Sequence, residues 1–270
     1  MLNIATISKA DDWLDTVLPR FVAYVRAHCS GPRRLHLLLL TTDDDETATA
    51  AAIARAAALF DEVVCEPFHD ATPQQRLLVF DELRASLPTT FGVPELLYID
   101  PDTDVVADLQ GIQSLSPNAE LLWAANPFPL RPVLEDLARH GFSRSGEEGI
   151  LPCVEPGFLY LRRDLSWDFA ALKEQFPDVH RFAPGSTYWT MLAQTLGSQA
   201  VRLPDDYNRT FWDVSGAAST ARSVHYTGQW KRLQPFVEYR RERRELVIHA
   251  QPQPLPQQAR RQQGQPAAET

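Results

Sequence analysis

The chain has 270 residues, a formal net charge of −9, 44% hydrophobic residues and 23% charged residues. This balance is typical of a globular protein with one large domain or two small ones. Because the net charge is negative, the surface as a whole does not attract nucleic acid, and we expect no nucleic-acid partner.

The cysteines and the first residues bear on the compartment. Cys29, Cys65 and Cys153 are odd in number and lack the spacing of zinc ligands, so we expect reduced thiols and no disulfide framework. Residues 1–14 do not combine a basic start with an apolar run, so no signal peptide is predicted. We therefore expect a cytoplasmic protein.

The first hundred residues alternate between predicted strands and predicted helices. The strands are short apolar runs, whereas the helices carry apolar residues at helical spacing. Asp11 or Asp12 is expected to cap the first helix, and Pro73 to open the third. The expected strands span 2–8, 34–42, 61–68 and 94–100, and the expected helices 11–28, 46–60 and 72–87. This alternation is typical of an α/β fold whose parallel sheet is covered on both faces.

The second half is less regular and ends in a segment of different composition. Strands are expected at 119–126, 157–163 and 221–228, and helices at 167–176 and 186–196. From Gln251 onward the chain is rich in Gln and Pro and has almost nothing to bury. We expect one domain over residues 1–250 and a disordered tail over 251–270.

The stretch "ELLYIDPDTDVVADL" at 95–109 brings an apolar strand directly to Asp100, Asp102 and Asp104. Buried carboxylates are costly unless a cation meets them, and ligands of parallel sheets bind beyond the carboxyl ends of the strands. Pro101 keeps Asp100 extended, and side chains two apart in an extended segment point to one side. Asp100 and Asp102 can therefore present oxygens to one hard cation such as Mg²⁺ or Mn²⁺.

Several classes of protein share such a motif. An EF-hand is excluded, because Val105 and Gly111 stand where that loop needs Gly and Glu. A phosphohydrolase of the haloacid dehalogenase type fits the strand and the first two aspartates, although Asp104 replaces its usual Thr. A nucleotide-sugar transferase, whose two carboxylates hold a metal, also fits, as does an ordinary acidic turn. The motif alone leaves these three open.

The rest of the chain resembles glycosyltransferase family eight, the group of glycogenin and the bacterial lipopolysaccharide glucosyl- and galactosyltransferases. "YIDPDTDVVADL" at 98–109 resembles that family's "YLDADTIVLGDL", and "VHYTGQWK" at 224–231 resembles its "HF-x-G-x-x-K". "DDWL" at 11–14, the segment "RLLVFDELRASLP" and "LPDDYN" at 203–208 resemble further family segments in the family's order. The resemblance covers roughly residues 2–236. It implies a GT-A fold, with a Rossmann-like mixed, mostly parallel central sheet flanked by helices.

The resemblance also implies a function. The expected activity is metal-dependent transfer of a hexose from a UDP-sugar to an unknown acceptor, with retention at the anomeric carbon and with Mn²⁺ or Mg²⁺. Implied metal ligands are Asp100, Asp102 and His225. Implied contacts to the nucleotide, sugar or diphosphate are Ser8, Asp11, Trp13, Arg76, Asp100, Gly228 and Lys231, with Trp13 stacking on the base or, alternatively, packing in a helix core. Implied catalytic residues are Glu155 and Lys231.

Two segments depart from the family pattern. "EPG" at 155–157 replaces the usual "N-S-G", and "STYWTM" at 186–191 replaces "D-Q-x-x-L-N". A member that binds the nucleotide sugar without transferring it therefore stays a second alternative to the transferase, beside the phosphohydrolase. The acceptor could be a glycan, a lipid-linked saccharide or a protein.

A basic segment follows the last motif. Residues 231–245 hold six Lys and Arg against three Glu, with aromatic residues among them. Residues 230–245 could contact an anionic membrane surface peripherally, or they could form a solvated C-terminal helix.

Overall fold

The structure is a computed structural model of the chain. It describes residues 1–10, 12–41, 46–68, 73–126, 131–142, 152–179, 184–210, 221–226, 234–240, 243, 245–253 and 255.

A sheet of seven strands forms the centre of the molecule, in the order β3-β2-β1-β4-β7-β6-β8. The strands β3, β2, β1 and β4 are parallel, β7 is antiparallel to both its neighbours, and β8 is parallel to β6. Their bounds are β1 Leu2–Lys9, β2 Arg33–Thr41, β3 Glu62–Pro67, β4 Leu96–Ile99, β6 Leu121–Ala125, β7 Val154–Leu161 and β8 Ala200–Arg202. The predicted mixed, mostly parallel α/β sheet is confirmed.

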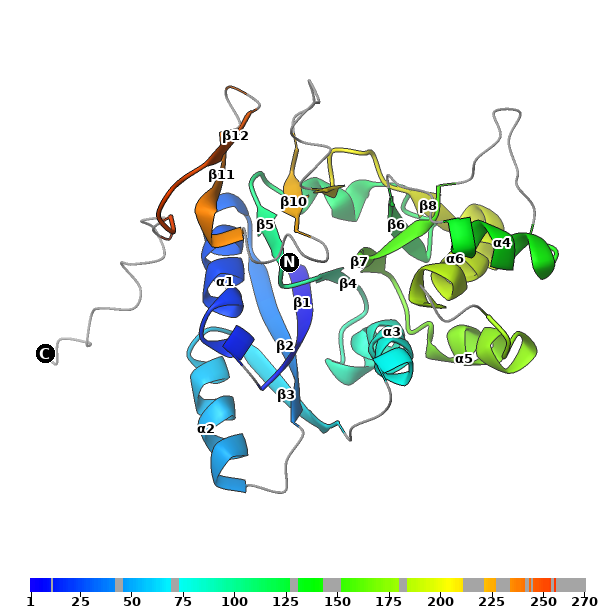
Figure 1. Ribbon diagram of the computed structural model, residues 1–270, viewed down its shortest axis with the longest axis horizontal. Coiled ribbons are helices and arrows are strands. Elements are labelled where there is room, and N and C mark those ends of the chain that lie inside the picture. Colours follow the sequence, from blue (N-terminus) through cyan, green and yellow to red (C-terminus); the bar gives the residue numbers. More distant parts are fainter. Residues whose placement is uncertain are drawn as a thin grey trace, which may run out of the picture.

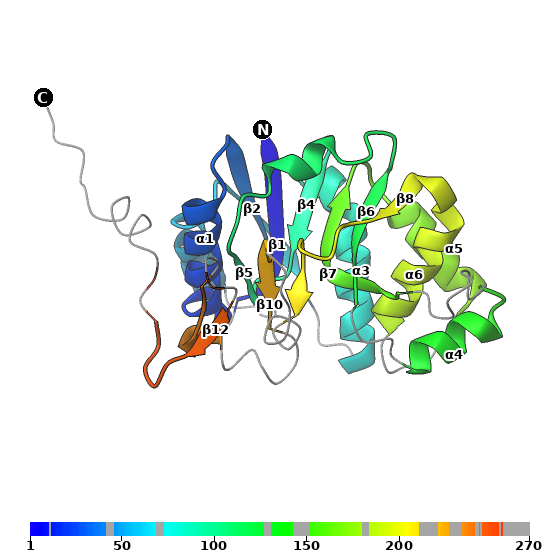
Figure 2. The ribbon, with the colours of Figure 1, turned by 90° about the horizontal axis from the view of Figure 1, so that it is seen from above.

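Helices cover both faces of this sheet (Figures 1 and 2). On one face, α1 (Val17–His28) and α2 (Glu46–Ala57) pack against the sheet. On the other face lie α3 (Pro73–Thr90), α4 (Arg131–Arg139), α5 (Ser166–Gln175) and α6 (Pro184–Leu196). Alternation along β4 divides the two cores, because Leu97 and Ile99 face α1 whereas Leu96 and Tyr98 face α3. Both cores therefore meet at β4, whose carboxyl end is Asp100.

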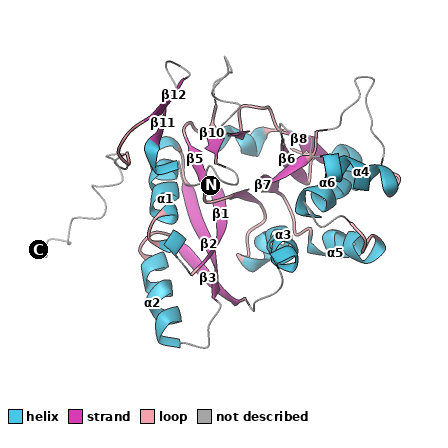
Figure 3. Cartoon of the chain, viewed as in Figure 1, coloured by secondary structure: helices cyan, strands magenta, loops and turns pink. Residues whose placement is uncertain are grey.

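A smaller sheet lies beside the central one, and its strand β5 (Thr103–Val105) follows β4 after a short turn (Figure 3). It consists of β5, β10 (Ser223–His225) and β9 (Arg209–Thr210), with β10 antiparallel to β5 and parallel to β9. A two-stranded antiparallel hairpin, β11 (Val237–Arg240) and β12 (Glu245–Ile248), follows. Short 3-10 helices span Asp12–Leu14 (η1), Gln110–Ser114 (η2) and Gly197–Gln199 (η3).

Two expected elements are wrong. The helix expected at 11–28 is a 3-10 turn followed by α1, which begins at Val17 after Thr16 and not after an aspartate cap. Pro19 explains the break, because proline is tolerated in the first turn of a helix but clashes with the preceding turn in its interior. The helix considered for 231–245 is also wrong, since Val237–Arg240 and Glu245–Ile248 are paired strands.

No helix within the described ranges is both long enough and apolar enough to cross a membrane. The last strand at the carboxyl side of the described chain is β12, and residues 256–270 of the expected tail lie outside the described residues. The division into a domain of 1–250 and a tail stays a prediction.

Candidate functional site

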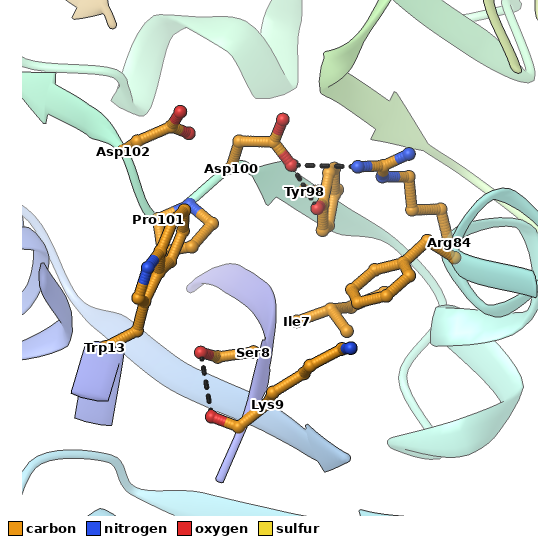
Figure 4. Close-up of a pocket in the computed structure, with 10 residues that line it drawn as sticks. Ile7, Ser8, Lys9, Trp13, Arg84, Tyr98, Asp100, Pro101 and Asp102 are labelled. Carbon is orange, nitrogen blue, oxygen red and sulfur yellow. Dashed lines mark hydrogen bonds and ion pairs between the residues drawn. The ribbon is translucent and has the colours of Figure 1, made fainter. Parts of the chain in front are cut away.

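A pocket of about 330 Å³ opens at the carboxyl ends of β1 and β4, where parallel sheets bind their ligands. Trp13 and Arg84 lie on opposite sides of it (Figure 4). The pocket is lined by Ile7, Ser8, Lys9, Trp13, Phe80, Arg84, Tyr98, Asp100, Pro101 and Asp102.

Asp100 is held at the end of β4 by its neighbours. Its backbone N–H donates to the carbonyl oxygen of Gly157 over 2.8 Å. Its Oδ1 accepts hydrogen bonds from the Tyr98 hydroxyl and, at 3.0 Å, from Nη2 of Arg84 (Figure 4). These bonds fix the orientation of the carboxylate, so that Oδ2 lies 3.7 Å from Nε2 of His225.

His225 reaches the same point from the smaller sheet. Strand β10 pairs with β5, with His225 opposite Thr103, and the N–H of Tyr226 donates to the carbonyl oxygen of Asp102 over 3.0 Å. This pairing puts His225 Nε2 3.4 Å from Oδ1 of Asp102. The ligand atoms of Asp100, Asp102 and His225 all lie within 4.8 Å of one another. The structure thus brings the three predicted metal ligands together.

The route to that convergence differs from the expected one. The predicted extended segment through Asp100 and Asp102 is wrong, because Pro101 and Asp102 form a turn. The two carboxylates still lie close together. Because the chain turns there, Asp104 does not join them and faces α1, where it binds Arg20.

Gly157 on β7 leaves room between two of these ligands. A Cβ at this position would lie 2.6 Å from Cε1 of His225 and 2.7 Å from Oδ2 of Asp100. The pairing of β6 with β7 is also irregular here, shifting between Trp123 and Ala124. Such irregularities are common next to functional sites. Sequence reasoning noted "EPG" as a departure and missed that this glycine is required.

The charges of the site favour a cation. Burial lowers the pKa of His225, but the carboxylates of Asp102, Glu155 and Asp100 outweigh burial and raise that pKa to about 9. Burial raises the pKa of Glu155, and the negative charge of Asp100 adds to this effect, while His225 opposes it. The carboxylate oxygens and the imidazole are a ligand set that suits Mn²⁺, and the space kept by Gly157 agrees with an ion between them.

Glu155, expected to be catalytic, lies beside this cluster on β7. Its Oε2 accepts a hydrogen bond from Nδ2 of Asn126 over 3.2 Å, and its Oε1 accepts one from the N–H of Gly157 over 3.3 Å. The side chain is half-buried, and these two bonds hold it beside the cluster.

The remaining predicted residues divide into two groups. Ser8 and Trp13 line the pocket, and Trp13 is partly exposed there while its neighbour Leu14 is buried in the core. The helix-core alternative therefore fits Leu14 better than Trp13. Outside the described residues lie Asp11, Gly228, Lys231 and the side chain of Arg76.

Arg84 is the main pocket residue that sequence reasoning missed. Its guanidinium lies over the Tyr98 ring and donates to Asp81 Oδ1 over 2.7 Å, in addition to its bond with Asp100. Arg84 lies on α3 eight residues after Arg76 in the sequence. The spacing of these two arginines was the signal available in the sequence.

The "STYWTM" segment at 186–191 is used for packing. It lies in α6, from the third residue of that helix onward, and is buried. The Thr190 hydroxyl donates to the carbonyl oxygen of Ser186 over 2.6 Å and accepts from the N–H of Val154 over 2.9 Å. Trp189 Nε1 donates to Asp81 over 2.9 Å, and a Cβ at Gly185 would overlap that carboxylate. The described bonds of this segment are to the protein itself.

Solved structures share this fold. The apo form of mouse xyloside xylosyltransferase 1 matches 84% of this chain and 97% of its own, with 13% sequence identity and a TM-score of 0.56. The galactosyltransferase LgtC, solved in complex with donor and acceptor sugar analogs, matches 87% of this chain and 89% of its own, with 14% identity and a TM-score of 0.61. No protein-family model matches the chain, and no curated protein matches it in sequence. At these identities the likeness concerns the fold, and it confirms the GT-A type that the motif resemblance implied.

Proposed function

We propose that the chain is a metal-dependent glycosyltransferase that moves a sugar from a UDP-sugar to an acceptor. The observation that carries this proposal is the convergence of Asp100, Asp102 and His225 around the space beside Gly157, at the mouth of a pocket walled by Trp13. The fold shared with a xylosyltransferase and with a galactosyltransferase supports glycosyl transfer as the reaction.

Asp100, Asp102 and His225 would hold Mn²⁺ or Mg²⁺. A bound ion supplies positive charge where the departing diphosphate becomes more negative. Arg84 and Tyr98 keep Oδ1 of Asp100 occupied, which leaves Oδ2 for the site.

The nucleotide would lie along the β1 side of the pocket. Trp13 offers an aromatic face for the uracil ring, Ser8 a hydroxyl, and Asp11 a carboxylate for the base edge. Gly228 and Lys231 follow His225 in sequence and would bind the diphosphate, as the motif resemblance implies.

Glu155 is the proposed catalytic carboxylate. It lies next to the proposed metal ligands, where Asn126 and the N–H of Gly157 donate to its two oxygens. In a reaction with retention it would face the anomeric carbon and stabilise the positive charge that develops there.

The contacts of Asp100 favour the transferase over a phosphohydrolase. In the hydrolase, the first aspartate attacks phosphorus and needs a nucleophilic oxygen. Here one oxygen of Asp100 accepts bonds from Arg84 and Tyr98, which withdraw electron density from the carboxylate. The position that should carry the hydrolase Thr is Asp104, which is paired with Arg20 away from the pocket.

The test is a thermal-shift panel of UDP and UDP-sugars with and without Mn²⁺, followed by an assay of UDP release. UDP should stabilise the protein only when the metal is present, by about 2.7 kcal/mol at 100 times its Kd. Phosphate released from simple phosphomonoesters would favour the hydrolase. Binding of UDP-sugars with no UDP release for any acceptor would favour the non-catalytic alternative.

The proposal also names a class of acceptor and a location in the cell. The acceptor would be a glycan, a lipid-linked saccharide or a protein, and the protein would act in the cytoplasm. Peripheral contact of residues 230–245 with an anionic membrane rests on their basic composition. Vesicles with and without anionic lipid test that contact by co-sedimentation.

A further inference from the structure

Asp104 is the aspartate of the motif that the proposed metal site does not use. It is 2% exposed on β5 and carries bonds on both oxygens. Its Oδ1 accepts from Arg20 Nε over 2.9 Å and from Gln234 Nε2 over 3.0 Å. Its Oδ2 accepts from Arg20 Nη2 over 2.6 Å and from the Tyr226 hydroxyl over 3.3 Å. The charge of Asp104 is therefore compensated inside the protein.

This carboxylate joins segments that are far apart in sequence. Arg20 comes from α1, which packs on β5, and its Nη2 also donates to the carbonyl oxygen of Val237 over 3.0 Å. Tyr226 directly follows His225, the last residue of β10. Gln234 lies shortly before β11, which begins at Val237. Asp104 and Arg20 thus tie the chain down on both sides of residues 227–233.

The strand that carries His225 is anchored mainly at its other end, where Arg222 accepts backbone bonds from Val106 and Ala107 and the Ser223 hydroxyl donates to the carbonyl oxygen of Tyr207. Strand β10 is three residues long, and β9, its second neighbour, has two. Backbone pairing over such a short length does not by itself define where a side chain at the strand end lies. The side-chain bond of Tyr226 to Asp104 adds a second attachment one residue beyond His225.

We propose that Asp104, locked by Arg20, is a positioning residue that holds the His225 imidazole in register with Asp100 and Asp102. This inference rests on the proposed metal site. Groups that orient metal ligands from outside the ligand set typically change metal affinity by about 10- to 100-fold when they are removed. A purely structural ion pair would change stability and leave the metal affinity of the folded protein unchanged.

The first test measures Mn²⁺ binding to the full-length, metal-free chain by titration calorimetry. Asp104→Asn should weaken Mn²⁺ binding by about 10- to 100-fold in protein whose circular dichroism matches wild type. The matched control is Arg162→Met. Arg162 is also a well-bonded arginine, but its partners belong to another part of the fold: the carboxylate of Glu95 and the carbonyl oxygens of Gln113, Leu115, Ser116 and Ala119. This control should lower the melting temperature and leave the Mn²⁺ affinity unchanged.

The second test separates stability from positioning. The double variant Arg20→Met with Asp104→Leu removes both charges together, so no buried charge is left alone, and much of the stability should return. Tyr226 and Gln234 then have no acceptor at position 104, so Mn²⁺ binding should be at least as weak as in Asp104→Asn. Recovery of Mn²⁺ affinity along with stability would overturn the inference.

A third variant covers the case in which the double variant does not fold. Tyr226→Phe with Gln234→Leu keeps the Arg20–Asp104 pair and removes only the bonds to β10 and to the segment before β11. It should weaken Mn²⁺ binding, and an unchanged affinity in the folded variant would overturn the inference. A wild-type chain that binds no Mn²⁺ would overturn the proposed function as well, whereas equal binding by wild type and Asp104→Asn would overturn this inference alone.

Discussion

Asp102 and Asp104 stand two residues apart and are buried to nearly the same degree, at 1% and 2% exposure. Asp104 faces the guanidinium of Arg20, with an amide and a phenol completing its surroundings. Asp102 faces the imidazole of His225 and lies close to a second carboxylate, that of Asp100. Burial alone therefore does not distinguish a structural acid from a binding one. The kind of partner does: Asp104 is matched by a permanently charged guanidinium, whereas Asp102 shares a titratable imidazole with a second carboxylate.

The largest expected effect is on ligand binding and concerns Asp102, the aspartate of the proposed metal site. Asp102→Asn should abolish the Mn²⁺-dependent stabilisation by UDP, because it removes the charge of one of two carboxylates that would hold the ion. The protein without ligand should still fold, with a melting temperature at or below that of wild type at neutral pH, since the charged His225 imidazole loses its nearest carboxylate partner. Thermal shift with and without Mn²⁺ measures both. Asp178→Asn, a largely exposed acid on another part of the surface, is the control, and a wild-type shift in Asp102→Asn would contradict the metal assignment.

Loss of Arg20, the cation that pairs with Asp104, should have its main effect on the stability of the fold. Arg20→Ala leaves the buried Asp104 carboxylate without its cation and should lower the free energy of unfolding by about 3–5 kcal/mol. Urea denaturation measures this. Arg131→Ala, which breaks an exposed pair with Glu135, should cost no more than about 1 kcal/mol. Equal losses in the two variants would mean that the Arg20 pair contributes no more than a surface pair.

Lys231 tests the proposed chemistry, the departure of the diphosphate from the sugar. Lys231→Ala should lower kcat by about 10²–10³, because its charge would matter most as the sugar–phosphate bond breaks. The melting temperature without ligand should stay close to wild type. Lys231→Arg should restore part of the rate, since a planar guanidinium does not reproduce a compact ammonium. Normal turnover in Lys231→Ala, or a much lower melting temperature, would assign the residue another role.

The smallest effect concerns the orientation of Asp100. Tyr98→Phe removes the hydroxyl that bonds Oδ1 and should weaken Mn²⁺ binding by about tenfold, while Arg84 still holds the carboxylate. Calorimetric titration with Mn²⁺ detects a change of this size. Tyr160→Phe, a buried tyrosine on β7 facing the other core, serves as the control, and the same loss in both would argue against a specific role for Tyr98.

Local patterns were enough to predict the α/β alternation of the first half, apart from the broken helix at 11–28, and the motif resemblance was needed to place His225 with Asp100. The residues that complete the site depend on distances that local patterns do not encode. Gly157 is required because of atoms on β4 and β10, and Arg20 and Asp104 are 84 positions apart. The broken helix at 11–28 could have been found from Pro19 alone.

Gly157 also offers an experimental tool. Replacing its hydrogen by a methyl group would crowd Asp100 against His225 without changing the chemical identity of either side chain. Gly157→Ala would therefore disturb the proposed metal site while every polar side chain of that site is kept. Loss of Mn²⁺ binding in this variant would show that the spacing of the ligands, and not only their chemical identity, makes the site.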